Sequence, residues 1–464
     1  MDEKKLPDLR NNKMRTMRIG RLLFTMALPL AISMLVQAFY NVVDSIYVAQ
    51  YSPNSGVTAL SLAFPIQNLQ IGFSTGIAVG MNSLLSKSLG EGNQERANRA
   101  AGNGIFLMGI AIAVFMLFGA FGAKYYYGMQ NLSPETKADG TAYTAICCIF
   151  TLGIFVEILG ERLLQASGRT IYTMFTQGAG AVLNILLDPL FIFGFAPLGI
   201  PEMGVAGAAV ATVIGQWVAA VMAVIFNLTR NPDVQFKLRF IRPRKDVVGK
   251  ILAVGIPSMI MMAIGSVMNF GMNQIFLGFE GVGETASGVF GIYFKLQSFF
   301  LMPLFGLNNA SISIIAYNYG ARQPDRIVKT LKRAVGAALG VMILGLLVFQ
   351  TVPGVLMGFF SSDNPTFTAL GISALRTVSW HFPLAAIGIA LGASFQALGN
   401  GVYSSITSLC RQLVALLPAA YLLSLTGDVH AVWWSFPIAE VVSVIVTLIL
   451  FGKIYRQKIK PMTE

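Results

Sequence analysis

The chain has 464 residues, of which 55% are hydrophobic and 12% are charged, and its mean hydropathy is +0.66. This composition excludes an ordinary water-soluble globular protein and predicts a protein that crosses a membrane many times. The net charge of +12 does not by itself indicate nucleic-acid binding, because its meaning depends on where the basic residues lie. The three cysteines, Cys147, Cys148 and Cys410, fall in apolar stretches without the spacing of a metal site or a reason to form a disulfide.

Apolar segments of helical length recur twelve times along the chain, each long enough to cross a bilayer. Backbone groups in lipid must be hydrogen-bonded within their own segment, so the expected fold class is an all-α membrane protein. The basic N-terminus leads into the first segment without a small-residue cleavage site, so we interpret that segment as a retained span. The predicted spans are 22–49, 57–86, 102–123, 140–160, 170–195, 203–228, 251–278, 285–317, 334–357, 366–392, 402–426 and 430–452.

The lysine and arginine residues predict the topology. With the N-terminus inside, 28 of the 33 lie in inner segments, Lys124 and Lys137 lie in outer loops, and Lys295, Arg376 and Arg411 lie within spans. This positive-inside asymmetry predicts cytoplasmic termini and a multi-pass protein of the cell membrane. It also explains the net charge by topology and contact with anionic membrane lipid, so nucleic acid is not an expected partner.

The two halves of the chain repeat each other, since three blocks recur in order at offsets of 228, 230 and 231. Six spans per repeat is an even number, so both halves enter the membrane from the same side, and a pseudo-two-fold axis along the membrane normal should relate them. We predict two six-helix lobes at 1–229 and 251–464, joined by a cytoplasmic linker at 230–250. The matched residues are Pro29 and Asn41 with Pro257 and Asn269; Gln67, Gly76, Gly90 and Arg96 with Gln297, Gly306, Gly320 and Arg326; and Gln165, Ala166, Gly168 and Tyr172 with Gln396, Ala397, Gly399 and Tyr403.

Charged residues within the spans differ between the halves. The first half has three acidic residues there and no basic one, whereas the second half has three basic residues and one acidic one. An unpaired carboxyl group in a low-dielectric site takes up a proton or binds a cation, so the first half is the expected place of a proton or Na⁺ site. These residues are Asp44, Glu157 and Asp188 in the first half and Lys295, Arg376, Arg411 and Glu440 in the second.

The repeat blocks and their surroundings resemble a known family, the multidrug and toxic compound extrusion (MATE) transporters. The resemblance covers nearly the whole chain, and FKLQS at 294–298 looks like the branch of the family found in Gram-positive bacteria. It implies a cation-coupled drug exporter with twelve helices in two lobes. The segments that carry it are PIQ at 65–67, GEGN at 90–93, QASGR at 165–169, NILLDP at 184–189, GVAGAAVAT at 204–212, MP at 302–303 and YNYG at 317–320.

An ion-coupling pocket is predicted in the outer half of the first lobe, formed by Asp44, Asn184, Asp188 and Thr212. Asp44 lies late in the outward-running first span, Asn184 and Asp188 are one turn apart on the fifth, and Thr212 lies in the upper part of the sixth. The resemblance maps the family's first-lobe polar site onto the same residues. The alternatives are interhelical hydrogen bonding for Asn184 and Thr212, and a helix-end position before Pro189 for Asp188.

A substrate cavity is predicted from polar and flexible residues of the first and seventh spans. The two asparagines in the seventh span depart from MATE members that have acids there, which argues against a second-lobe sodium site of that kind. The predicted cavity residues are Gln37, Tyr40, Asn41, Asn269, Met272 and Asn273.

Other charged residues have less specific interpretations. Glu157 and Glu161, with Arg162 adjacent, are expected to form an ion pair or an inner gate. In the second lobe, Arg376, Arg411 and Glu440 form a predicted charge cluster in which Glu440 pairs with one of the two arginines, because a lone intramembrane charge is costly. His381 could titrate near neutral pH or be a hydrogen-bonded packing residue.

These observations predict a monomeric antiporter that exports amphipathic, cationic small organic compounds by alternating access, with H⁺ favoured over Na⁺ as the coupling ion. No cofactor, metal centre or enzymatic motif is expected, since no phosphate loop, HExxH or nucleophile elbow occurs. The alternative is a lipid-linked oligosaccharide flippase, whose anionic substrate would favour a basic cavity that Lys295, Arg376 and Arg411 could supply.

Overall fold

The computed structural model describes residues 12–52, 55–130, 132–358 and 365–462, and the regular structure in these ranges is helical apart from one isolated bridge between Phe195 and Ile200. The first half contains α1 (Lys13–Thr16), α2 (Ile19–Tyr51), α3 (Ser55–Gly90), α4 (Gln94–Leu117), η2 (Phe118–Gly122), α5 (Ala123–Gly128), α6 (Pro134–Ile149), α7 (Leu152–Ala166), α8 (Thr170–Ile192), η3 (Ala196–Leu198) and α9 (Gly204–Arg230).

The second half begins after the short 3₁₀ helix η4 (Leu238–Phe240) of the linker. It contains α10 (Lys245–Leu277), α11 (Gly283–Gly320), α12 (Pro324–Thr351), α13 (Pro353–Gly358), α14 (Pro365–Val378), η5 (Ser379–His381), α15 (Phe382–Ala397), α16 (Gly401–Leu409), η6 (Cys410–Leu416), α17 (Leu417–Ser424), α18 (Val429–Val432), α19 (Ser435–Ile454), η7 (Tyr455–Ile459) and η8 (Lys460–Met462).

Twelve membrane-crossing segments account for these helices, as the sequence predicts. Ten of them in the described ranges are single stretches long and apolar enough to span a bilayer, and α6 with α7 forms an eleventh that bends by 46°. The twelfth, α3, is 36 residues long but has no stretch as apolar as those in the other ten. Its polar residues include Gln67 and Gln70, whose amides bond to α6 and to Thr151 at the α6–α7 break. Burying polar side chains against neighbouring helices removes their cost in lipid.

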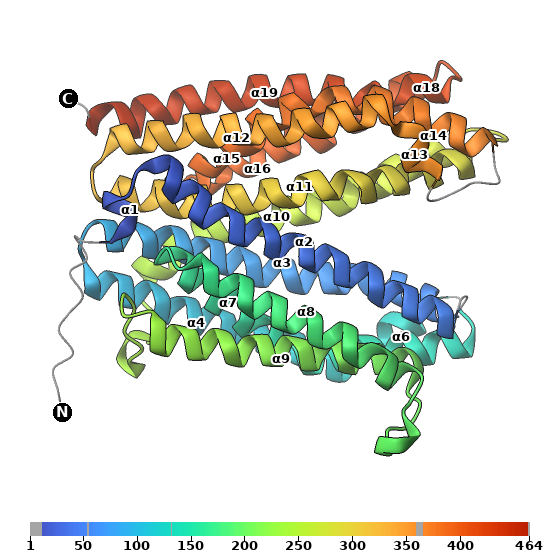
Figure 1. The fold of residues 1–464 in the computed structure, drawn as a ribbon, viewed down its shortest axis with the longest axis horizontal. Helices are drawn as coiled ribbons and strands as arrows, with labels where there is room; N and C mark the ends of the chain where they lie inside the picture. The colour runs from blue at the N-terminus through green and yellow to red at the C-terminus, as the bar shows by residue number, and fades with distance from the viewer. Residues whose placement is uncertain (1–11, 53–54, 131, 359–364, 463–464) are drawn as a thin grey trace.

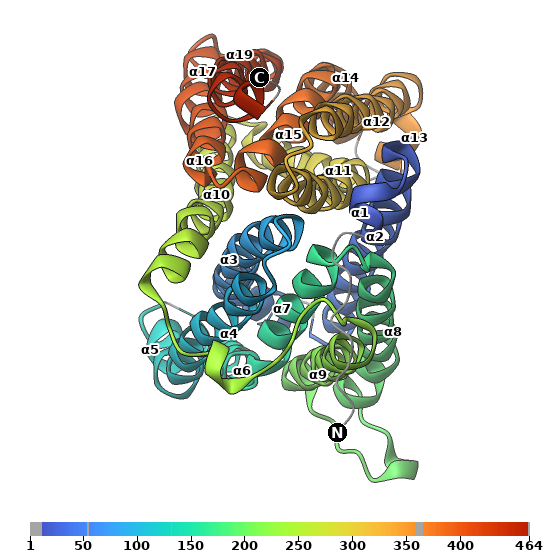
Figure 2. The ribbon, with the colours of Figure 1, turned by 90° about the vertical axis from the view of Figure 1, so that its left-hand side faces the viewer.

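The helices form two lobes, with α2 to α9 in one and α10 to α19 in the other (Figure 1). One end of the bundle, which we call the terminal end, holds α1, the chain between α9 and α10, and η8. Figure 2 looks onto this end. The lobes diverge toward the opposite end, where α6, α14 and α18 lie (Figure 1). The two lobes are therefore in contact at the terminal end and farther apart at the opposite end.

The closure at the terminal end is built from matching residues of the two repeats. A Cβ atom at Gly90 of α3 would overlap the Tyr317 carbonyl oxygen of α11, and one at Gly320 would overlap the Lys87 carbonyl oxygen of α3. Deeper in the same contact, Asn82 Nδ2 donates a 3.2 Å hydrogen bond to Ser313 Oγ. Only glycine allows backbones to approach this closely. The α3–α11 contact is therefore reciprocal, as a pseudo-two-fold axis requires.

The N-terminal helix α1 adds a contact that the repeat does not contain. Arg326 of α12 donates to the carbonyl oxygens of Met14 (2.9 Å) and Met17 (2.8 Å) through Nη2 and to Asn318 Oδ1 (3.0 Å) through Nε. Asn318 Nδ2 also donates to the Met14 carbonyl oxygen, at 3.3 Å. The start of the first lobe is thereby hydrogen-bonded to the second lobe.

Candidate functional site

Helices α8 and α9 position three of the four residues predicted for ion coupling. Asn184 and Asp188 lie one turn apart on α8, and Thr212 faces them from α9. Asn184 Nδ2 donates to Asp188 Oδ1 at 3.1 Å and to Thr212 Oγ1 at 3.3 Å. All three side chains are buried. The bond to Thr212 is therefore interhelical, whereas the bond to the Asp188 carboxyl group lies within α8.

Asp188 is not at a helix end, because α8 continues through Pro189 to Ile192. Proline has no backbone N–H, so the carbonyl oxygen of Ile185, four residues earlier, lacks its usual helical donor. Pro189 therefore removes one backbone hydrogen bond from α8 without ending the helix.

Asp44 contributes from α2, which packs against α8. Its side chain is only 9% exposed, and its charge acts on Asp188 and on Tyr143 of α6. The structure thus brings Asp44 into the same polar region as Asp188, and the two negative charges repel each other. No distance short enough for a hydrogen bond joins them within the described part of the chain.

Three buried oxygens of this region have no hydrogen-bond donor: Asp44 Oδ1, Asn184 Oδ1 and Asp188 Oδ2. Unsatisfied buried acceptors are rare and costly in folded proteins, particularly on carboxyl groups. A proton on either carboxyl group, or a small hard cation between them, would satisfy these atoms. The described residues contain no group of three His, Cys, Asp or Glu side chains that could hold a metal ion, so a cation here would also need amide or hydroxyl oxygens.

The predicted cavity residues of the first lobe lie one to two turns from Asp44 on α2. Gln37 hydrogen-bonds the Tyr40 hydroxyl, which also interacts electrostatically with Asp44 and Glu157. The side chain of Asn41 lies outside the described part of the structure. Tyr143, which the sequence did not single out, accepts a 3.1 Å bond from Gln67 Nε2 and interacts electrostatically with Asp44. Only the tertiary packing of α6 identifies it.

The predicted cavity residues of the second lobe are engaged or buried. Asn269 and Asn273 each donate to a carbonyl oxygen one turn earlier on α10, at 3.1 and 3.0 Å. Met272 is fully buried in the hydrophobic core, so the prediction that it lines a cavity does not agree with this structure.

The acids of α7 do not form the ion pair expected from the sequence. Glu161 accepts a 2.7 Å hydrogen bond from Thr176 of α8, while Arg162 Nη1 donates to Gln165 Oε1 at 3.1 Å. No ion pair involving Glu157, Glu161 or Arg162 occurs among the described residues. The side chains of Glu161 and Arg162 are adjacent in sequence and point in different directions around α7, which separates their charged groups.

The charge cluster of the second lobe forms around Glu440 of α19. Arg411 Nη1 lies 3.9 Å from Glu440 Oε1, which confirms that Glu440 pairs with one of the two arginines. Arg376 is exposed and forms no ion pair with Glu440. His381 Nδ1 lies 3.7 Å from Glu440 Oε2, and its Nε2 is 2.9 Å from the Tyr293 hydroxyl. His381 is therefore a hydrogen-bonded member of this cluster.

Comparisons with known proteins agree with this architecture. The MatE family model matches residues 29–190 and 257–422, which together are most of the chain. The "Multidrug export protein MepA" of Staphylococcus saprophyticus subsp. saprophyticus is 23% identical over 427 residues, covering 91% of each chain. Other matches carry the same name in Staphylococcus aureus and Staphylococcus haemolyticus, which fits the Gram-positive branch.

Two solved structures share the fold over the whole chain. The crystal structure of MATE in complex with MaL6 superposes with a TM-score of 0.89 at 24% identity, covering 100% of both chains. An outward-facing multidrug resistance MATE family transporter of the MOP superfamily superposes with a TM-score of 0.87 at 24% identity, covering 100% of this chain and 99% of the other. At this identity the similarity establishes the twelve-helix, two-lobe fold.

Proposed function

The chain belongs to the MatE family, and we propose that it is an antiporter that exports amphipathic, cationic organic compounds in exchange for H⁺ or Na⁺. The observation that carries the proposal is the set of unmatched buried oxygens on Asp44, Asn184 and Asp188. The name of the Staphylococcus relatives, multidrug export protein, supports export as the direction of transport and drugs as substrates. The names of these relatives denote transporters, and we expect no enzymatic activity.

The coupling step follows from the charges of the pocket. Two carboxylates close together in a low-dielectric site repel each other, so the pocket binds H⁺ or Na⁺ to relieve the repulsion. Uptake of the ion then allows α2 and α8 to come closer and weakens the attraction of the lobe for a cationic substrate. The ion must be bound more tightly in one state than in the other, because equal affinity in both drives nothing. We favour H⁺, because the pocket lacks the additional carboxyl groups that would serve as ligands of a metal ion.

Helix α2 contains a feature that suits such a rearrangement. Pro29 cannot donate a backbone hydrogen bond to the Thr25 carbonyl oxygen, and the hydroxyl of Thr170, at the start of α8, donates to that oxygen instead at 3.4 Å. Proline within a helix is a common place for bending. A change in the α2–α8 contact at Asp44 and Asp188 can therefore be taken up by a bend of α2 at Pro29.

The orientation is proposed with the terminal end in the cytoplasm, following the positive-inside distribution of Lys and Arg. The closure at α3 and α11 then seals the cytoplasmic side, and the divergence of the lobes faces outward. We propose that the protein acts as a monomer in the cell membrane, because each chain contains both lobes.

Efflux from proteoliposomes under separately imposed pH and Na⁺ gradients tests the proposal. We expect a lipophilic cation to move against its gradient when a pH gradient is applied, and little movement with Na⁺ alone. A lipid-linked sugar assayed in the same vesicles tests the flippase alternative. That alternative is weakened by Arg411, whose charge is directed at Glu440 at 3.9 Å. Translocation of the sugar without gradient-driven export of the cation would contradict the antiporter.

A further inference from the structure

The chain between α9 and α10 is hydrogen-bonded to the first lobe. Gln94 Nε2 donates to the Asp233 carbonyl oxygen at 2.7 Å, and the Gln235 N–H donates to Asn98 Oδ1 at 2.8 Å. Arg169 of the α7–α8 turn also pairs with the Asp233 carboxyl group at 3.2 Å. Burial raises the pKa of Asp233, and the charge of Arg169 opposes that shift.

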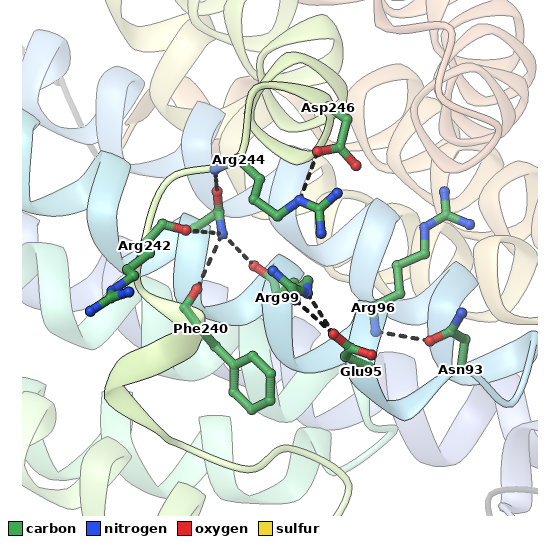
Figure 3. Close-up of polar contacts among 9 residues, drawn as sticks. Asn93, Glu95, Arg96, Arg99, Phe240, Arg242, Arg244 and Asp246 are labelled. Atoms are coloured by element: carbon green, nitrogen blue, oxygen red, sulfur yellow. Dashed lines mark hydrogen bonds and ion pairs between the residues drawn. The ribbon is translucent and has the colours of Figure 1, made fainter.

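A second set of hydrogen bonds holds residues 240–244, which lie just before α10, against α4. Asn103 of α4 donates to the carbonyl oxygens of Phe240 and Arg242, at 3.2 and 3.4 Å, and accepts from the Arg244 N–H at 2.8 Å (Figure 3). A Cβ atom at Gly102 would overlap the Phe240 carbonyl oxygen, so the backbone lies directly on α4. A linker between two moving lobes needs only sufficient length and a polar surface. The hydrogen bonds that hold this chain against α4 are therefore not explained by a linker role alone.

The fixed backbone presents an exposed face that is both apolar and basic. Val234 and Phe240 are buried against the lobe, whereas Phe236 is 38% exposed and Leu238 is 85% exposed. Between and after them come exposed Lys237, Arg239 and Arg242. An apolar side chain as open as Leu238 on an ordered backbone indicates a surface that meets something apolar.

The basic side chains of this exposed face outnumber the acidic side chains that could pair with them. Nearby acids are already paired, since Glu95 bonds to Arg99 and Asp246 bonds to Arg244 (Figure 3). Arg239 and Arg244 add to the effect of Arg99 in lowering the pKa of Glu95. Lys237, Arg239 and Arg242 form no ion pair among the described residues, and the Arg242 guanidinium points away from the other labelled side chains (Figure 3).

We propose that residues 236–242 form a docking surface for anionic phospholipid headgroups, with Leu238 and Phe236 entering the membrane interface and Lys237, Arg239 and Arg242 contacting the phosphates. Figure 2 shows this segment at the terminal end, on the side of the first lobe that faces away from the second lobe. With the terminal end in the cytoplasm, this position would lie at the inner surface of the bilayer. Basic residues next to apolar ones at a membrane surface bind anionic lipid by charge and by insertion together. The segment then anchors the first lobe to the membrane while the second lobe moves.

The test uses full-length Leu238→Cys carrying an environment-sensitive fluorophore, with Cys410 replaced by serine, in nanodiscs of phosphatidylcholine with or without phosphatidylglycerol. We expect the emission to shift to the blue with phosphatidylglycerol and to revert at 1 M salt, where the screening length falls to about 3 Å. Met129→Cys, which is 88% exposed at the opposite end, is the reference position and should show no comparable dependence on phosphatidylglycerol.

Charge variants separate a specific surface from general attraction to a basic protein. Lys237→Gln, Arg239→Gln and Arg242→Gln combined should weaken phosphatidylglycerol retention, measured by native mass spectrometry, by about tenfold. Lys329→Gln, Lys332→Gln and Arg333→Gln combined remove the same charge from the exposed face of α12 and should have little effect. Equal losses in both triple variants, identical emission in the two nanodiscs, or displacement of phosphatidylglycerol by soluble polyglutamate would each overturn the proposal. None of these measurements depends on the transported substrate.

Discussion

The two lobes share one fold and differ in where they carry charge. At the repeat offsets, Asp44 of the first lobe corresponds to Met272 of the second. On α8, Asn184 and Asp188 correspond to Ala415 and Ala419, in and just after the π-helical turn of the eleventh span. The only polar position retained is Thr212, which corresponds to Ser443. Duplication of the backbone therefore preserved the helix packing while the carboxyl pocket exists in one lobe alone.

The second lobe places its own charges at positions that are apolar in the first. Glu440, which pairs with Arg411 and lies beside His381, corresponds to Ala209. An acid with a cationic partner nearby is stabilised in its charged form, whereas acids that repel each other without a cation favour binding of one. Under the proposed function, the first lobe therefore responds to the coupling ion, and the second has a structural charge cluster.

The terminal ends of the lobes show a second difference. Arg96 pairs with Glu91 at 2.7 Å on the surface of the first lobe. Its counterpart Arg326 has Ala321 at the matching position and bonds instead to the backbone of residues 14 and 17 and to Asn318. Because no carboxyl group stands at position 321, Arg326 is available to join the two lobes.

The largest effect is expected from removing either first-lobe carboxyl group. Asp44→Asn and Asp188→Asn should each reduce gradient-driven efflux in proteoliposomes to background, because a pocket that no longer titrates cannot bind the ion differently in two states. The variants should insert and elute on gel filtration like the parent protein. Glu440→Gln in the second lobe is the control, and its efflux should still depend on the gradient. Parental rates in both asparagine variants would move the coupling site elsewhere, with Glu157 the next residue to examine.

The glycine contacts should behave alike in both lobes. Gly90→Ala and Gly320→Ala each force a Cβ atom against a backbone carbonyl group, and we expect each to lower stability by about 1–3 kcal/mol, measured by thermal unfolding in detergent. Gly340→Ala on α12, where a Cβ atom would meet nothing within 4 Å, should be neutral or slightly stabilising. A large effect at only one of the two positions would show that the α3–α11 contact is not the reciprocal one described here.

The two related arginines should behave differently. Arg326→Gln removes the charged donor that joins the lobes, and we expect the population open at the terminal end to rise about tenfold. Distances between one spin label in each lobe, measured by pulsed electron paramagnetic resonance, would show this shift. Arg96→Gln breaks a partly exposed ion pair within one lobe, and such pairs contribute about 0–1 kcal/mol. Matching distance distributions for both variants would remove the proposed role of Arg326.

The smallest effects are expected from the neutral members of the pocket. Asn184→Ala and Thr212→Ala each remove one neutral hydrogen bond and should slow efflux by about two- to fivefold, corresponding to about 0.5–1 kcal/mol. Initial rates at fixed pH gradients would measure this. Ser443→Ala, at the matching position of the second lobe, should leave the rate unchanged. If Ser443→Ala slowed efflux as much as Thr212→Ala, the functional difference between the lobes would be smaller than proposed.

The sequence by itself determined the helical class, the twelve spans and the duplicated arrangement. Uninterrupted apolar length leaves helices as the only backbone that lipid accepts, and an even number of spans per repeat fixes the symmetry. The sequence also identified Asn184 and Asp188 as neighbours, because residues one turn apart on a helix lie on the same face in any surroundings.

Contacts between helices were decided by the tertiary structure alone. The side of α2 on which Asp44 lies, the presence of Tyr143 beside it and the burial of Met272 depend on how distant helices rotate about their axes. Apolar composition does not define that rotation in a membrane, where lipid-facing and core-facing surfaces are equally hydrophobic. For the same reason, Glu440 could be expected to pair with an arginine, but the choice of Arg411 over Arg376 required the packing of α19 against η6.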